Sequence, residues 1–213
     1  MNIGVFDSGN GGRFVAEKLQ TLLPQHSYTV LSDPEHAPYG ERTYDDIRKL
    51  THAAIVPLAK SCPLIVIACN TATAAAIDSL RVAYPETIFV GFEPMIKPAA
   101  SLTSTGTITL LATRATAHAP RTRQLIRDYA PNLTIETPPT TDWAWRIDHG
   151  QADDIDLSDV RDTVTSGSDT IIIGCTHYIA LQSELELMGV PVLEPTEAIA
   201  RRIEVLTAPQ PQQ

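Results

Sequence analysis

Two cysteines have the type and the surroundings that chemistry on a small molecule requires. Cys69 ends the apolar, β-branched run 63–68, and Cys175 ends the similar run 169–174. Each is followed by side chains that can form hydrogen bonds. Such a run is typical of a buried parallel strand, whose carboxyl end opens into a crevice. We therefore expect the two thiols to lie at two strand ends and to form the two halves of one site.

The matching contexts restrict what these thiols can do. A single buried cysteine is usually a packing residue, which is how we interpret Cys62. Disulfide exchange would require the two strands to approach bonding distance. Zinc is a less favoured alternative, because Cys69, Cys175 and His177 give no tight ligand cluster. The favoured hypothesis is acid and base catalysis on both faces of one carbon, in which one thiolate removes a proton and the other thiol delivers one, so that the product is the mirror image.

Polar groups near the thiols are candidates for auxiliary roles. Cys69 should open a helix, and a thiol at a helix N-terminus can have a lowered pKa because that end favours an anion. Asp7 ends the first expected strand, and it could cap a helix, act on the nearby thiol or hold a substrate ammonium group. His177 could be a core histidine, but its place two residues after Cys175 suits an acid/base auxiliary.

Strand and helix patterns alternate along the chain, which predicts an α/β fold of mostly parallel sheets with helices on both faces. Cys69 lies 62 residues after Asp7, and Cys175 lies 62 residues after Thr113. This spacing suggests two similar α/β domains and leaves an internal duplication open. We place the first domain at 1–93 plus 192–213 and the second at 94–191. The expected strands are 2–6, 28–31, the run before Cys69, 87–91, 108–112, 133–136, the run before Cys175, and 190–193. The expected helices are 13–23, 43–60, 71–83, 115–129, a short one with Trp143 and Trp145, 158–166, 179–188 and 196–206.

Composition excludes several classes of protein. The chain has 213 residues, 43% of them hydrophobic, which is enough for a core without disulfides. A formal net charge of −9 argues against a nucleic-acid partner. No apolar run approaches the ~20 residues of a membrane span, and no signal peptide is visible. Three cysteines without a C-x-x-C pair indicate reduced thiols and a cytoplasmic location. The tail 209–213 is expected to be disordered.

Several phrases together resemble the glutamate racemases, which are cofactor-independent members of the aspartate/glutamate racemase superfamily. They cover most of the chain in the family's order: Ile3-Gly4-Val5-Phe6-Asp7-Ser8-Gly9, Pro38-Tyr39-Gly40-Glu41, Ala68-Cys69-Asn70-Thr71-Ala72-Thr73-Ala74, Val90-Gly91-Phe92-Glu93-Pro94 with Ile96-Lys97-Pro98-Ala99, Leu111-Ala112-Thr113, and Gly174-Cys175-Thr176-His177-Tyr178. The phrase around Glu93 and Lys97 points to glutamate racemases rather than to their aspartate-specific relatives.

The resemblance implies two α/β domains with the active site in the cleft between them, and it implies neither cofactor nor metal. It assigns Cys69 and Cys175 as the acid/bases, the first serving D-glutamate and the second L-glutamate. Asp7 and His177 would assist the thiols. Asp148 falls where the family has a catalytic glutamate and is one methylene shorter. The residues implied to bind the substrate are Asp7, Ser8, Tyr39, Gly40, Asn70, Thr71, Thr113, Thr176 and His177.

The implied function is interconversion of L- and D-glutamate, which supplies D-glutamate for peptidoglycan. Two alternatives stay open: a racemase of aspartate or another acidic amino acid, and a weakly active paralogue that binds an acidic ligand. The partner would be the small-molecule substrate, and the resemblance allows a homodimer without fixing the oligomeric state.

Overall fold

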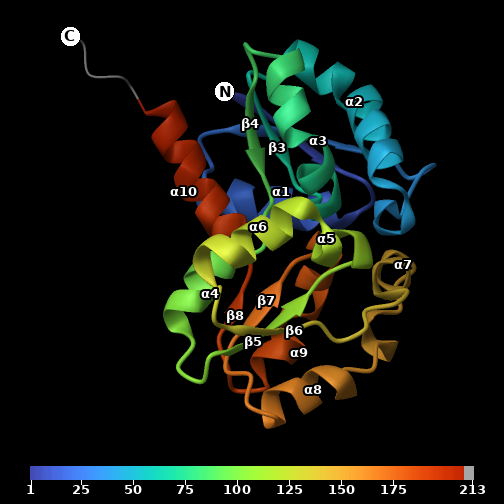
Figure 1. Cartoon of the computed structure of the whole chain (residues 1–213). Helices are drawn as coiled ribbons and strands as arrows, with labels where there is room; N and C mark the ends of the chain where they lie inside the picture. Colours follow the sequence, from blue (N-terminus) through green and yellow to red (C-terminus); the bar gives the residue numbers. More distant parts are fainter. Residues whose placement is uncertain (209–213) are drawn as a thin grey trace.

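The computed structural model describes residues 1–208, in which two four-stranded parallel sheets lie one above the other (Figure 1). The first sheet has the order β2-β1-β3-β4. Its strands are β1 (Asn2–Asp7), β2 (Ser27–Ser32), β3 (Leu64–Ile67) and β4 (Ile88–Gly91). The elements that pack around it are α1 (Gly11–Leu22), the 3-10 helix η1 (Tyr39–Glu41), α2 (Tyr44–Ser61), α3 (Asn70–Ala83) and α10 (Thr196–Thr207). We call this set the first unit.

The second sheet has the order β6-β5-β7-β8, so it repeats the strand sequence of the first. Its strands are β5 (Thr107–Leu111), β6 (Thr134–Glu136), β7 (Ile171–Ile173) and β8 (Val192–Leu193). The other elements of this second unit are α4 (Ile96–Leu102), α5 (Arg114–His118), α6 (Pro120–Tyr129), α7 (Trp143–Asp148), η2 (Ala152–Asp154), α8 (Ser158–Thr165), η3 (Thr176–Leu181) and α9 (Gln182–Glu186). The predicted α/β fold with two similar units is confirmed, and Cys69 and Cys175 follow the equivalent strands β3 and β7.

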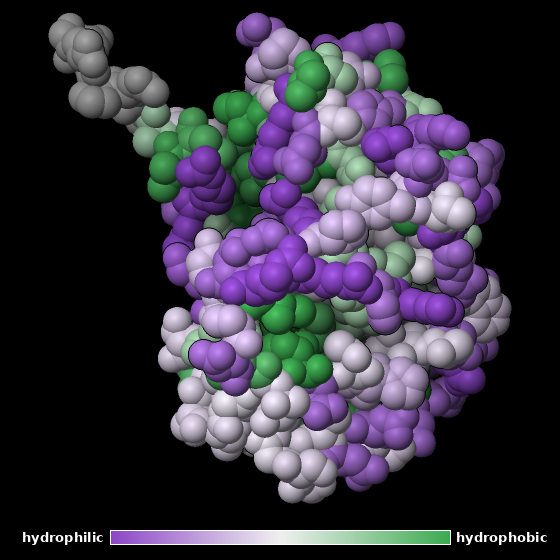
Figure 2. Space-filling view, in the orientation of Figure 1, coloured by the Kyte–Doolittle hydropathy of each residue, from purple (hydrophilic) through white to green (hydrophobic). Residues whose placement is uncertain are grey.

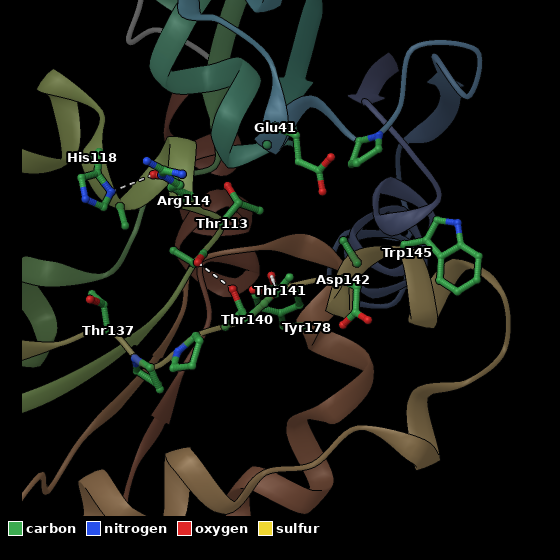
Figure 3. A pocket seen from close by; sticks show the side chains of 17 residues that line it. Glu41, Thr113, Arg114, His118, Thr137, Thr140, Thr141, Asp142, Trp145 and Tyr178 are labelled. Atoms are coloured by element: carbon green, nitrogen blue, oxygen red, sulfur yellow. Dashed lines mark hydrogen bonds between the residues drawn. The ribbon is translucent and has the colours of Figure 1, made fainter.

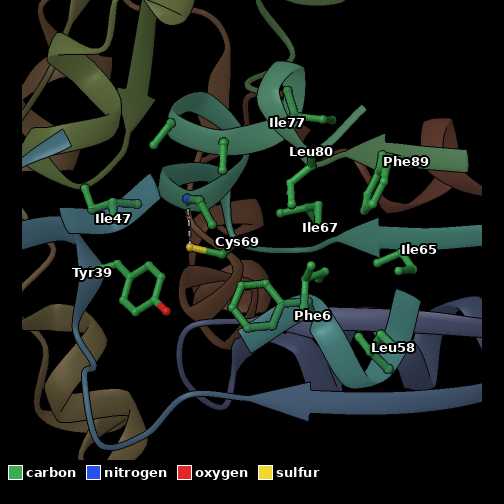
Figure 4. Close-up of a cluster of buried hydrophobic side chains, with 14 of the residues drawn as sticks. Phe6, Tyr39, Ile47, Leu58, Ile65, Ile67, Cys69, Ile77, Leu80 and Phe89 are labelled. Atoms are coloured by element: carbon green, nitrogen blue, oxygen red, sulfur yellow. Dashed lines mark hydrogen bonds between the residues drawn. The ribbon is translucent and has the colours of Figure 1, made fainter. Parts of the chain in front are cut away.

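Both faces of the central strands are buried, which explains their continuous aliphatic runs. In the first unit, one face of the sheet packs against α2 and α3 (Figure 4), through Phe6, Ile65, Ile67, Ile47, Ile55, Leu58, Ile77 and Leu80. The opposite face packs against α1 and α10, through Ile3, Val5, Leu64, Val66, Val15, Leu19, Ile199 and Ile203. Cys69 lies at the edge of the first of these layers, so packing fixes the strand end that carries the thiol.

The second sheet is covered in the same way. One layer contains Leu111, Ile171, Ile173, Trp143, Val160, Leu181 and Leu185. The other layer contains Ile108, Leu110, Ile172, Ile96, Ala99 and Ala130. Cys175 belongs to the first of these layers together with α7. The two thiols are therefore anchored by separate cores, and their relative position depends on how the two units meet.

Three helices differ from expectation. The expected helix 115–129 is two helices, because the backbone is extended at Ala119 and Pro120 starts α6 at its first position. The expected helix 179–188 is a 3-10 helix, η3, followed by the short α9. No helix was expected between 91 and 108, but this segment contains α4, whose Pro98 sits in the first turn, where a missing N–H costs little.

Helix α6 carries polar side chains on its exposed face, including Arg123, Gln124, Arg127 and Asp128. It runs across the middle of the molecule, where Figure 2 shows a hydrophilic belt. Below it, Figure 2 shows exposed hydrophobic surface on the second unit.

The chain crosses between the units at residues 92–95 and again at 194–195. Strand β8 pairs with β7, so the second sheet extends two residues beyond the expected boundary at 191, whereas α10 packs on the first unit. The division into domains at 93/94 and 191/192 stays a prediction.

Within residues 1–208 no helix is both long and apolar enough to span a membrane. The expectation for 209–213 lies outside the described residues.

Candidate active site

A small cavity of about 20 Å³ lies where the strand ends of the two units meet. Its lining residues come from both units: Ser8, Pro38, Tyr39, Gly40, Cys69, Asn70, Thr71, Thr113, Ala144, Gly174, Cys175, Thr176 and His177. Cys69 and Cys175 are both buried in its wall. The cavity has room for about one water molecule. It is far too small for an amino acid, so the units as they stand are closed on the site.

Cys69 occupies the N-cap position of α3. Its sulfur accepts a hydrogen bond from the Ala72 N–H at 3.4 Å and lies 3.4 Å from Ser8 Oγ. Burial and the negative charge of Asp7 nevertheless raise the pKa of Cys69 to about 11, and the contacts with Ser8 and Ala72 only partly offset them. The expectation of a lowered pKa is therefore wrong for the closed site, because burial outweighs the helix N-terminus. This thiol is protonated at neutral pH.

Cys175 has a different partner. Its sulfur lies 3.7 Å from His177 Nδ1, and Nε2 of the same ring lies 3.2 Å from Asp148 Oδ2. Burial lowers the pKa of His177, but its hydrogen bonds to Asp148 and Cys175 outweigh burial and hold the pKa well above 6.5. Burial likewise raises the pKa of Asp148, and the hydrogen bond and charge of His177 reverse that effect and lower it. The raised pKa favours the imidazolium form of His177, which lies beside the Cys175 sulfur.

Gly9 makes room for this pair of charges. A Cβ atom at Gly9 would lie 2.8 Å from His177 Nε2 and 3.0 Å from Asp148 Oδ2. Real Cβ atoms essentially never approach other atoms closer than 3.0 Å. The residue must therefore be glycine if His177 and Asp148 are to keep this position.

Asp7 joins the two units from the floor of the site. It is fully buried, and its carboxylate accepts hydrogen bonds from the Gly9 N–H at 2.7 Å and from Thr176 Oγ1 at 2.8 Å. Asn70 makes a second link, since its Nδ2 donates to the Gly174 carbonyl at 2.8 Å. These contacts fix the strand ends of the first unit relative to those of the second across the cavity.

Hydroxyl groups gather at another corner of the site. Thr71 Oγ1 lies 3.1 Å from Thr113 Oγ1 and 3.0 Å from Thr116 Oγ1. Thr116 was not predicted as a site residue, although it is fully buried and completes this trio. Its position three residues after Thr113, in the first turn of a helix that follows a strand end, is the signal that could have identified it. The trio supplies hydroxyl donors that suit a carboxylate.

Tyr39 and Gly40 enter the cavity from η1. Tyr39 is buried and donates its hydroxyl proton to Asp33 Oδ2 at 2.7 Å. A Cβ atom at Gly40 would lie 2.8 Å from Thr113 Cβ, so glycine is required for the close approach of η1 to α5.

A larger pocket of about 410 Å³ lies directly outside this contact (Figure 3). It shares four lining residues with the small cavity: Pro38, Gly40, Thr113 and Ala144. Its remaining wall is formed by Glu41, Ala112, residues 137–142, Tyr178, and side chains of α5 and α7.

The structure brings the predicted site residues together, with one distinction. Asp7 and Asp148 do not line the cavity, but each contacts a residue that does, namely Thr176 and His177. Among residues 1–208 no group of three or more His, Cys, Asp or Glu side chains is arranged to hold a metal ion. The geometry offers two thiols on facing strand ends, one beside an imidazolium and one held protonated.

Comparisons with known proteins agree with this arrangement. The family model described as Asp/Glu/hydantoin racemase matches residues 13–203. A glutamate racemase of Pseudomonas putida (strain W619) is 36% identical over 97% of this chain and 81% of its own length. The Escherichia coli glutamate racemase, solved with L-glutamate and the activator UDP-MurNAc-Ala, superposes with a TM-score of 0.86 at 32% identity, covering 99% of this chain and 84% of the other.

The fold is shared with proteins whose sequences are much less similar. The aspartate racemase of Picrophilus torridus has a TM-score of 0.70 but only 19% identity, over 99% of this chain and 96% of the other, so it shares the fold alone. The matched family model and the relatives above 30% identity show that the chain belongs to the Asp/Glu/hydantoin racemase family, and within it to the glutamate racemases.

Proposed function

We propose that this protein interconverts L- and D-glutamate by moving a proton at Cα between two thiols, without a cofactor. The observation that carries the proposal is the pair Cys69 and Cys175, which follow equivalent strands and face one cavity from opposite units. A planar, deprotonated Cα between them could be protonated from either face.

In the direction from L to D, the Cys175 thiolate removes the Cα proton. The electron pair of the C–H bond moves onto Cα and its carboxylate, and the Cys69 thiol then gives its proton to the opposite face. The raised pKa of Cys69 supports this role, because a donor must hold its proton at neutral pH. The imidazolium of His177 favours a thiolate at Cys175. The reverse direction exchanges the two roles.

Asp7, Asp148 and His177 set the protonation of the thiols or hold the substrate ammonium group. Backbone N–H groups, hydroxyls and an amide would bind the two carboxylates; these come from Ser8, Gly40, Asn70, Thr71, Thr113 and Thr176. Because the cavity holds about one water molecule, the units must separate to admit the substrate and close again for the proton transfers.

Glutamate is favoured over aspartate by the comparisons, since the curated relatives at 33–36% identity carry the name glutamate racemase. The likeness to an aspartate racemase is limited to the fold. The product D-glutamate would serve peptidoglycan synthesis. We place the reaction in the cytoplasm, because both thiols must stay reduced to exchange protons.

Circular dichroism of the purified protein with L-glutamate, D-glutamate and each enantiomer of aspartate tests the proposal. We expect the glutamate signal to decay to zero from either side and the aspartate signal to change far more slowly. Faster aspartate turnover would favour the aspartate alternative, and no turnover of either would favour a binding paralogue. Turnover that is lost with a chelator would favour the zinc alternative.

Heavy water tests the two-base step separately. Starting from L-glutamate, the first D-glutamate formed should carry deuterium at Cα, because the donating thiol has already exchanged with solvent. Product that keeps the substrate hydrogen would indicate a single base acting on both faces.

A further inference from the structure

The pocket of about 410 Å³ lies outside the small cavity and is lined by both units. Gly40 and Thr113 belong to both walls, so the contact between them separates the two spaces. Pro38 and Ala144 belong to both walls as well, so the two spaces are direct neighbours. The pocket is therefore placed where an incoming amino acid would first be held.

Ionisable side chains are spread along this pocket. Arg114 and His118 lie at one end, Asp142 lies at the other, and Glu41 lies between them (Figure 3). His118 Nδ1 lies 3.0 Å from the Arg114 carbonyl oxygen, and Asp142 forms an ion pair with Arg146 at 3.0 Å. Among the described residues, neither Arg114 nor Glu41 has an ion-pair partner.

We propose that this pocket is an outer binding site for the free amino-acid substrate, in which Arg114 holds a carboxylate and Glu41 holds the ammonium group before the units open. The proposal rests on the proposed function, since it takes the substrate to be an acidic α-amino acid. A protein with a net charge of −9 repels such a substrate at long range, so a local cation at the entrance has a clear use.

The exposure of Arg114 and Glu41 limits how strongly they can bind the substrate. Both side chains are exposed, so each contact is worth at most about 1 kcal/mol, or roughly fivefold in affinity. An exposed contact is also screened by salt. The outer site should therefore act on the capture of substrate and leave the proton transfers in the buried cavity nearly untouched.

The test compares Arg114→Gln with Arg123→Gln. Arg123 is exposed on α6 and does not line the pocket, so both variants remove one positive charge. We expect Arg114→Gln to raise KM for L- and D-glutamate about twofold to fivefold with less than a twofold change in kcat. The ratio of kcat/KM for the two enantiomers equals the equilibrium constant between them, which is 1 because they are equally stable. The variant must therefore change kcat/KM by the same factor for L- and D-glutamate. Arg114→Lys should recover part of the loss, and Arg123→Gln should match wild type.

Salt and fluorescence give readouts that a merely structural role would not move. Raising NaCl from about 0.05 M to about 0.5 M should raise the wild-type KM but change that of Arg114→Gln far less.

Trp145 lines the pocket and is half exposed, so glutamate should quench its fluorescence. The quenching should need higher glutamate in Arg114→Gln, and Trp145→Phe should lose it. Glutarate, which lacks the ammonium group, should quench more weakly unless Glu41 is changed to Gln.

Wild-type KM and wild-type salt dependence in Arg114→Gln would overturn the outer site, and so would an equal rise in KM in Arg123→Gln. Either result could be obtained in an enzyme that racemises glutamate normally, and the proposed function would then stand. Absence of glutamate turnover in the wild type would instead overturn the proposed function itself.

Discussion

His177 Nε2 lies 3.2 Å from the carboxylate of Asp148, although Asp148 is one methylene shorter than the glutamate that the resemblance predicts there. The contact is made because α7 ends at Asp148 with Trp143 and Ile147 buried in the second core, which brings the end of the helix toward the site. Asp148 is therefore held against His177 and is not a freely solvated surface acid.

We expect Asp148→Asn to lower turnover at least about tenfold, equivalent to ~1.4 kcal/mol of activation free energy, while the fold stays intact. The amide cannot supply the charge that holds the proton on His177. Asp148→Glu should be tolerated better. Asp154→Asn, which removes an exposed acid six residues later, is the matched control. Wild-type kcat and KM in Asp148→Asn, measured by circular dichroism, would contradict the role.

Cys69→Ser and Cys175→Ser should each abolish racemisation, because a hydroxyl is too weakly acidic to carry the proton near neutral pH. Cys62→Ser is the control. Cys62 is equally buried but lies in the core of the first unit, where its sulfur accepts a hydrogen bond from Asn2 at 3.3 Å. It should keep its turnover even if it unfolds at lower temperature. Full activity in either of the first two variants would rule out the two-thiol mechanism.

Gly9→Ala should lower turnover by displacing His177 and Asp148, since the added methyl would lie within 3.0 Å of both. The backbone of Gly9 does not have the left-handed φ that penalises alanine, so the effect comes from the contact. A double-mutant cycle with Asp148→Asn checks this route. If the two losses simply add, Gly9→Ala acts through something other than the charge pair.

The raised pKa of His177 makes its contribution to stability depend on pH. The folded protein binds this proton more tightly than the unfolded chain, so the contribution is complete below about pH 6.5 and is lost as the pH rises through the higher folded-state pKa. The free energy of unfolding in urea should therefore differ most between wild type and His177→Gln at low pH.

His52 provides the control of opposite sign. Burial lowers its pKa, so its folded form loses stability as the pH falls below about 6.5. The difference between wild type and His52→Gln should thus shift in the opposite direction on acidification. Parallel pH profiles for the two variants would contradict the assignment of the His177 charge.

The sheets were predictable because their strands are buried on both faces, which requires continuous aliphatic runs such as the one before Cys69. The strand-end rule then located both thiols and Asp7, since parallel strands of one sheet present their carboxyl ends at one edge. Helix ends were less predictable. Pro120 was read through as part of one long helix, although the extended residue before it and its own missing N–H begin a new one.

What local sequence could not supply was the effect of the second unit on the first. The pKa of Cys69 was misjudged because burial and the charge of Asp7, which depend on tertiary packing, outweigh the helix N-terminus. Thr116 was missed because its hydroxyl is buried against Thr113 and against Thr71 of the opposite unit, and the second contact cannot be read from the local sequence. The larger pocket has the same origin, since neither unit contains it alone.

The two crossings at residues 92–95 and 194–195 have a consequence for how the site opens. Each carries a Glu-Pro pair, and each glutamate forms an ion pair, Glu93 with Arg121 and Glu194 with Lys18. A single connection would let the units twist and swivel freely, whereas two fixed points define a line. We therefore expect the units to open by rotating about that line, a motion that keeps the strand ends carrying Cys69 and Cys175 aligned with each other.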